Sequence, residues 1–145
     1  MADAEIGGDN TLTPDRGGRM KLYFLLCSQL ARAAVIPTGH RLLADDVVLH
    51  AAGRHPLAGE FAGKQAFLDA YTKTLAALGG TVEAVAIQDL LVGPERAVAL
   101  VRERATRGEQ VLEFDRVNVY RLRDGQIVEI WSYDFDPYAL DAFWA

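Results

Sequence analysis

The hydrophobic period of the chain changes after Gly80, and this change constrains the fold more than any other feature of the sequence. From Lys64 to Leu78 apolar residues recur at helical spacing, and the pair Gly79-Gly80 ends the predicted helix. Beyond this pair, apolar and polar residues alternate as they do in strands with one buried face. Turn residues, among them Asp124-Gly125, divide this part into four predicted strands, residues 81–92, 97–106, 110–123 and 126–135. Consecutive strands with tight turns predict an antiparallel meander.

The rest of the chain is predicted to be mostly helical. Helical spacing predicts a first helix over residues 21–35 and a short helical piece over 40–46, followed by a β-branched strand over 47–52. Residues 53–63 are predicted to be a long connection with turns, and Asp136-Pro137 predicts the start of a C-terminal helix. One curved sheet with helices on one face is the economical packing. We expect a flexible tail over residues 1–19 and a single domain over residues 20–145.

Length and composition limit the class of protein. A chain of 145 residues suits one domain with a real core, and a net charge of −5 argues against nucleic acid or an anionic membrane as a partner. The single cysteine, Cys27, excludes an internal disulfide and favours a cytoplasmic protein. No apolar run is long enough to cross a bilayer, and the first residues lack the features of a secretory signal.

The order of the elements, together with the segments LLADDVVLHAAG, PLAGEFAGKQAFLDAY and RDGQIVEIW, resembles the nuclear transport factor 2-like superfamily. Within it, the chain is most similar to the SnoaL-like and ketosteroid isomerase-like proteins, and the resemblance covers residues 20–145. It implies an α+β fold, a cone-shaped α+β barrel in which a strongly curved antiparallel sheet wraps around N-terminal helices. A pocket would open at the wide end. The family includes isomerases, polyketide cyclases, epoxide hydrolases, dehydratases and non-catalytic proteins, so the fold does not give the reaction.

The resemblance also implies a site. It places a catalytic base at the end of the first strand, three residues before a glycine, where His50 precedes Gly53. The family's oxyanion donors fall near Tyr23 and on Asn118, and the last strand brings Asp134 toward the same pocket. We therefore expect His50 as general base, Asp134 as its orienter, and Asn118 and Tyr23 as polar donors. The residues expected to bind substrate are Arg116, Tyr120, Ser132, Ile130, Phe67 and Tyr71.

Other interpretations of these residues stay open. His50 could be a buried histidine bonded to a backbone carbonyl, with Asp134 capping a loop. Arg116 could bind a carboxylate or phenolate, pair with Asp134, or form a salt bridge at the rim. His50 and His55 are separated by a turn and lack an evident third ligand, so neither a metal site nor a cofactor is predicted.

The predicted function is cofactor-independent proton transfer on a small hydrophobic substrate with a polar group. A cyclase, isomerase or dehydratase of a polyketide-like or terpenoid-like substrate in secondary metabolism fits this description. Two alternatives remain. One is a non-catalytic module that binds a small ligand or a protein. The other is an epoxide-opening hydrolase in which Asp134 and Arg116 act as a pair around a water.

The outer face of the predicted sheet indicates an assembly. Strand alternation places apolar and aromatic residues on this face, namely Val117, Val119, Trp131 and Tyr133. A monomer rarely exposes a large contiguous apolar patch. We therefore expect a homodimer through the outer sheet face, unless the C-terminal segment covers it.

Overall fold

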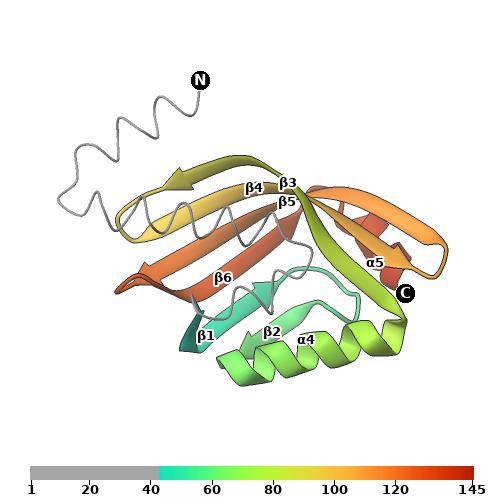
Figure 1. The fold of residues 1–145 in the computed structure, drawn as a ribbon, viewed down its shortest axis with the longest axis horizontal. Coiled ribbons are helices and arrows are strands. Elements are labelled where there is room, and N and C mark those ends of the chain that lie inside the picture. Colours follow the sequence, from blue (N-terminus) through green and yellow to red (C-terminus); the bar gives the residue numbers. More distant parts are fainter. Residues whose placement is uncertain (1–42) are drawn as a thin grey trace.

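The computed structural model describes residues 43–145, which form one curved six-stranded sheet and two helices (Figure 1). The sheet has the strand order β2-β1-β6-β5-β4-β3. Its neighbours are antiparallel except for β1 and β6, which run parallel. The strands are β1 (Leu43–Ala51), β2 (Gly59–Ala62), β3 (Gly80–Val92), β4 (Arg96–Arg107), β5 (Gln110–Arg123) and β6 (Gln126–Asp134), and the helices are α4 (Lys64–Leu78) and α5 (Pro137–Trp144).

The predicted α+β fold with a curved sheet is confirmed, although the sheet is mixed rather than wholly antiparallel. The meander of β3 to β6 follows the alternating pattern and the turns closely. The helix predicted over 64–78 is α4, and Gly79 ends it with a left-handed φ of 64°. Asp136 caps α5 by accepting a hydrogen bond of 3.1 Å from the Ala139 amide. The predicted N-terminal tail, the helix over 21–35 and Tyr23 lie outside the described residues.

Two predictions of local structure are wrong. Residues Leu43–Asp46 belong to β1 and not to a helical piece, because Leu43 pairs with Ile127 of β6. The predicted connection over 53–63 contains a strand, β2, which pairs antiparallel with the end of β1. Three of its four residues are exposed and only Phe61 is half-buried, so the sequence has no alternating pattern that would reveal the strand. Both errors arise from contacts with strands elsewhere in the sheet.

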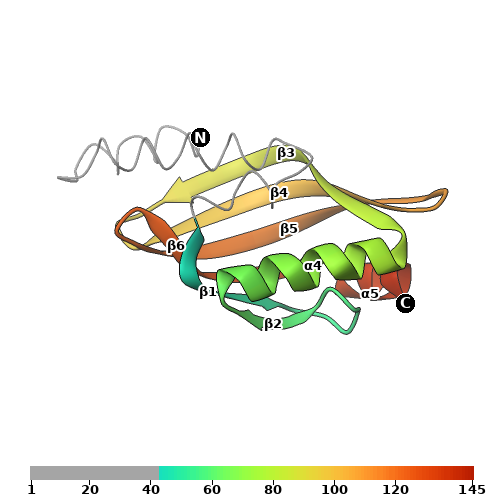
Figure 2. The ribbon, with the colours of Figure 1, turned by 60° about the horizontal axis from the view of Figure 1, so that its bottom comes forward.

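The helices cover one face of the sheet and divide its core into two parts. Figure 2 shows α4 running along this face, with α5 near the end of α4 where β3 begins. One buried cluster joins β1, β4 and β6 to Phe67 of α4. The second lies around Leu140 and Trp144 of α5, with Leu57 and Phe114. Tyr71 of α4 packs against both clusters, so the space beside it lies between them.

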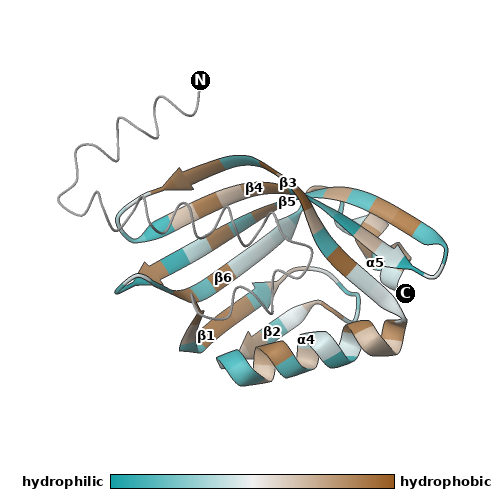
Figure 3. Ribbon diagram, viewed as in Figure 1, coloured by the Kyte–Doolittle hydropathy of each residue, from teal (hydrophilic) through white to brown (hydrophobic). Residues whose placement is uncertain are grey.

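The long strands have one buried and one more exposed face, and Figure 3 shows hydrophobic and hydrophilic residues interleaved along them. On β4 the alternate residues Ala97, Ala99, Val101 and Ala105 are almost fully buried. The position between Val101 and Ala105 on the same face is held by a glutamate, Glu103, which is only 7 % exposed. A buried carboxylate is costly without a partner, so this position points to a polar site inside the fold. Neither helix within residues 43–145 is long and apolar enough to cross a membrane.

Candidate active site

A small cavity lies between the two core clusters, on the face of the sheet that carries the helices. It has a volume of about 40 Å³, enough for a few water molecules or one small substrate group. The sheet, α4, α5 and the loop after β1 all contribute to its wall. The polar lining comes from His55, Tyr71, Arg116 and Ser132, and the apolar lining from Leu49, Ala51, Leu57, Val82, Phe114 and Trp144. Apolar walls with a few converging polar groups are typical of a small-molecule site.

His55 is the unusual member of this lining. Its side chain is 6 % exposed, and neither ring nitrogen has a hydrogen-bond partner among the described residues. Burial lowers the pKa of its imidazole below the ordinary value of 6.5, while the charges of Asp141 and Asp134 act to raise this pKa and that of Arg116 acts to lower it. His55 is therefore neutral at physiological pH, and its ring forms part of the cavity wall.

Arg116 lies between two buried carboxylates. Its Nε donates to Asp134 Oδ1 at 2.7 Å, and its Nη1 donates to Glu103 Oε2 at 3.0 Å. Burial lowers the pKa of Arg116, but Glu103 and Asp134 raise it by more, so the guanidinium stays charged. Burial raises the pKa of Glu103 above its ordinary value, although Arg116 opposes this shift. We call these three residues the buried ion triad.

The other two polar lining residues are Ser132 and Tyr71. Ser132 Oγ donates to Asn118 Oδ1 at 2.7 Å, and both residues are buried. Asn118 does not line the cavity, so its predicted role as an oxyanion donor has no direct geometric support. Burial raises the pKa of Tyr71, which keeps its phenol protonated and able to donate a hydrogen bond.

The predicted dyad of His50 and Asp134 is not formed. His50 pairs in register with Trp131 and stacks on its ring at 5.5 Å, on the outer face of the sheet. Its Nδ1 lies 3.0 Å from Glu60 Oε2, and its Nε2 lies 2.7 Å from Glu129 Oε2. Asp134 instead binds Arg116 on the opposite face. The reason is strand parity: Leu49 and Ala51 line the cavity, so the residue between them faces away.

Of the six residues expected to bind substrate, three line the cavity and three do not. Tyr71, Arg116 and Ser132 line the cavity, and their role in binding stays a prediction. Phe67, Tyr120 and Ile130 belong to the first core cluster and are not among the lining residues. Tyr23, expected as an oxyanion donor, lies outside the residues that the structure describes.

Sequence reasoning missed two residues of the site. Glu103 had a usable signal, since the alternation of buried small residues along β4 places it on the inner face. His55 was considered only as a metal ligand, and it lies in a loop without a periodic pattern. The direction in which a loop side chain points depends on the distant residue that fixes the loop, and no local sequence pattern reveals that residue.

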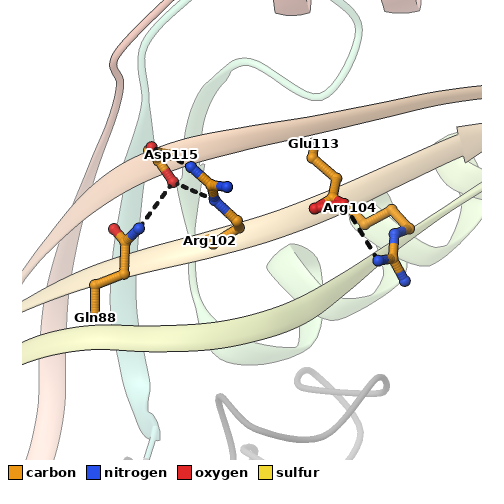
Figure 4. A network of polar contacts seen from close by, with 5 residues as sticks. All are labelled: Gln88, Arg102, Arg104, Glu113 and Asp115. Carbon is orange, nitrogen blue, oxygen red and sulfur yellow. Dashed lines mark hydrogen bonds and ion pairs between the residues drawn. The ribbon is translucent and has the colours of Figure 1, made fainter.

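The outer face of the sheet carries a different set of ion pairs, which Figure 4 shows. Arg102 binds Asp115 through two hydrogen bonds of 2.9 Å, and Gln88 donates to the same carboxylate at 3.3 Å. Arg104 donates to Glu113 at 3.3 Å and also to Glu83 at 3.1 Å. Arg102 and Arg104 are well exposed, and solvent screening leaves such pairs with little effect on stability. The buried ion triad is therefore the exception that calls for a functional explanation.

The burial of neutral His55 predicts a loss of stability in acid. The unfolded chain takes up a proton on His55 near its ordinary pKa of 6.5, whereas the folded protein resists protonation to lower pH. The contribution of neutral His55 to the free energy of unfolding is thus fully present above the pKa that His55 has in the unfolded chain. It is lost as pH falls through the pKa that His55 has in the folded protein. Between about pH 7.5 and about pH 5.5, the melting temperature should fall further in the wild type than in His55→Gln. Equal falls in the two proteins would contradict the assigned neutral state.

Comparison with known proteins identifies the family. Residues 32–130 match the SnoaL-like domain family, and the chain belongs to that family. An uncharacterised protein of Mycobacterium tuberculosis is 32 % identical over 103 residues, which cover 70 % of this chain and 78 % of the relative. The predicted resemblance to SnoaL-like, nuclear transport factor 2-like proteins is thus confirmed.

Solved structures agree on the fold. A nuclear transport factor 2-like protein of unknown function from Burkholderia pseudomallei has a TM-score of 0.72 at 18 % identity, covering 88 % of this chain and 98 % of its own. An epoxide hydrolase of Mycobacterium tuberculosis, described as LEH-like, has a TM-score of 0.66 at 14 % identity, covering 88 % and 92 %. At these identities the likeness concerns the fold alone.

Proposed function

We propose that this protein is a cofactor-independent enzyme that transfers protons on a small molecule, with His55 as the base and Arg116 as the stabilising cation. The observation that carries the proposal is the buried imidazole of His55, which lines a cavity and lacks a hydrogen-bond partner among residues 43–145. Buried polar groups nearly always have a partner, and an exception calls for an explanation. A substrate that occupies the cavity would supply the missing partner.

The geometry suits a reaction in which negative charge develops on a substrate oxygen. Neutral His55 can accept a proton from carbon or from a hydroxyl. Arg116 uses Nε and Nη1 for its two carboxylates, and a guanidinium has five N–H donors, so donors remain for a substrate oxygen. Tyr71 adds a protonated phenol to the same wall. Such preorganised donors stabilise an oxyanion in a site that excludes water.

The charges around the cavity favour an uncharged substrate. The positive charge of Arg116 is offset by Glu103 and Asp134, and His55 is neutral. An anionic substrate would therefore meet no net positive charge, which argues against Arg116 as a carboxylate-binding residue. The apolar lining and these donors fit a neutral molecule with a carbonyl or hydroxyl group, as in the cyclase, isomerase or dehydratase reactions on polyketide-like or terpenoid-like substrates.

The buried ion triad favours a second candidate, an epoxide-opening hydrolase. Arg116 links two carboxyl groups whose surroundings differ, and burial raises the pKa of Glu103. In such a reaction Asp134 would activate a water, and Glu103 would supply the proton to the epoxide oxygen. Of the three residues only Arg116 lines the cavity, so this reaction also requires the two carboxyl groups to reach the substrate past its guanidinium. The reaction also needs no cofactor and takes an uncharged substrate.

One experiment separates the candidates. The full chain is incubated with a panel of uncharged enones, β-hydroxyketones and epoxides, in ²H₂O or in H₂¹⁸O, and products are analysed by mass spectrometry. Deuterium on carbon, or loss of water, supports the proton-transfer reaction. Incorporation of ¹⁸O into a diol supports epoxide opening and overturns the first candidate. Tight retention of a panel compound without any turnover overturns both and identifies a binding module.

We also propose that two copies of the chain pair through the outer sheet face. Val117 pairs in register with Tyr133, and Val119 with Trp131, so their side chains form one apolar patch. Tyr133 is 51 % exposed. The ion pairs of Figure 4 and the His50–Glu129 pair lie on the same face, and an apolar centre with a charged rim is typical of an interface.

Light scattering at micromolar concentration should give the mass of a dimer, and Trp131→Glu should give that of a monomer, since it would bury an unpaired charge in the interface. Tyr138→Glu is the matched control, because Tyr138 is 84 % exposed on α5 and away from this patch. A monomeric mass for the unmodified protein would rule out the dimer.

A further inference from the structure

The loop that carries His55 is hydrogen-bonded to α5 through the carboxylate of Asp141. Asp141 Oδ1 accepts a hydrogen bond of 2.7 Å from the Arg54 amide and one of 3.1 Å from the His55 amide. Ala58 then donates its amide to the carbonyl of His55 at 2.9 Å, which closes a turn around the histidine. The backbone of His55 is thus held on both sides, its amide by Asp141, 86 positions further along the chain, and its carbonyl by Ala58.

The close approach of these groups depends on Gly53. This residue has a φ of 126°, a conformation that L side chains rarely adopt. A Cβ at Gly53 would lie 3.0 Å from Asp141 Oδ1 and 3.0 Å from both Cδ2 and Nε2 of His55. Asp141, Gly53 and His55 therefore pack so closely that no side chain fits at position 53.

The helix that carries Asp141 is itself fixed. Leu140 and Trp144 are each 1 % exposed and lie in the second core cluster. At the end of α5, Arg107 Nη1 donates to the carbonyl oxygens of Phe143 at 3.1 Å and Ala145 at 2.7 Å. Figure 1 shows α5 near the end of the sheet at which β4 and β5 are joined by their hairpin. Asp141 is thus presented by a rigid element.

We propose that Asp141 is a positioning residue for His55: its carboxylate holds the two loop amides so that the imidazole faces the cavity beside Arg116. The inference rests on the proposed function of His55, since Asp141 is not among the residues that line the cavity. It acts on the base through the loop and touches neither a substrate nor a reacting atom.

The charge of Asp141 has a second, separable effect. Burial lowers the pKa of His55, and Asp141 from α5 and Asp134 from β6 oppose this effect, while Arg116 from β5 adds to it. Asp141→Asn keeps an acceptor oxygen for the two amides and removes the charge. Asp141→Ala removes both. The two variants therefore separate the position of the loop from the electrostatic effect on the imidazole.

The test uses the full chain, labelled at its three histidines, and follows their NMR titrations together with amide exchange. The His55 signal is identified by its loss in His55→Gln. In Asp141→Asn, the titration midpoint of His55 should move to lower pH, with the amides of residues 54 and 55 still protected. In Asp141→Ala, those amides should exchange about tenfold faster or more, the change expected when charge-assisted hydrogen bonds are lost. Asp69→Ala, which removes an exposed carboxylate on α4 that accepts a hydrogen bond from Gln65, should change neither readout.

Wild-type protection of both amides in a folded Asp141→Ala would overturn the inference. If Asp141→Ala does not fold, amides of residues 54 and 55 that exchange in the wild type as fast as free loop amides would overturn it. An unmoved His55 midpoint in Asp141→Asn would remove only the electrostatic effect of Asp141. Neither readout uses a substrate. Turnover that survives in His55→Gln would therefore contradict the proposed function alone. The NMR results would still test the role of Asp141.

Discussion

Replacing His55 by glutamine is expected to lower kcat/KM for the substrate found in the panel by about 10²–10⁴-fold, the usual contribution of a general base. Glutamine has a similar size and can form hydrogen bonds in the cavity, but it cannot accept a proton at neutral pH. The cavity lining and the loop amides held by Asp141 should survive the change, since those bonds use the backbone of His55. Steady-state kinetics near pH 7 give the readout, and circular dichroism checks the fold.

The matched control is His50→Gln, which changes the histidine that the sequence favoured as base. His50 lies on the outer face, between Glu60 and Glu129 and against Trp131. Its loss removes contacts with two glutamates on the outer face, and kcat/KM should change by no more than a few-fold. A loss of turnover in His50→Gln that matched the loss in His55→Gln would contradict the assignment of the base.

Replacing Arg116 by methionine is expected to destabilise the fold by about 3–5 kcal/mol, the cost of leaving a buried charge without its partner. Glu103 and Asp134 would then face each other, with no cation to offset their charges. Methionine keeps much of the apolar volume of the side chain, so the loss reports on charge more than on packing. Chemical denaturation near pH 7 measures the difference in the free energy of unfolding.

Two comparisons make the result specific. Arg123→Met removes an exposed arginine that pairs with exposed Asp46, and it should lower the free energy of unfolding far less than Arg116→Met does. The double variant Glu103→Gln with Arg116→Met should be more stable than Arg116→Met alone, because one of the two unpaired charges is gone. If Arg116→Met and Arg123→Met proved equally mild, the buried ion triad would not be the strongly coupled unit described above.

The sequence predicted the elements well where the signal was local. Alternation and turn residues defined the four long strands, and helical spacing with Gly79 defined α4. These patterns depend on one buried face for each element, so they can be recognised without knowledge of the partners. The short strand β2 and the start of β1 were missed, because pairing with distant strands decides their structure.

The candidate site was harder to predict, since it depends on the face of the sheet to which each strand side chain points and on distant residues that fix the loops. The pairing of Arg116 with Asp134 was one of several alternatives that the sequence left open, and the two residues are direct neighbours across β5 and β6. The error at His50 was one of parity, for a shift of one residue turns a strand side chain to the other face. His55 could not be placed at all, because the carboxylate that holds its loop comes from the last helix.

The most direct test of the central claim is a crystal structure of the protein with an unreactive analogue of its substrate. We expect the analogue in the cavity between the two core clusters, with a polar atom within about 3.2 Å of a His55 ring nitrogen and an oxygen within reach of Arg116. The analogue would then satisfy the imidazole that has no partner in the described part of the chain. An analogue bound on the outer face beside His50 and Trp131, with the cavity unoccupied, would contradict the account.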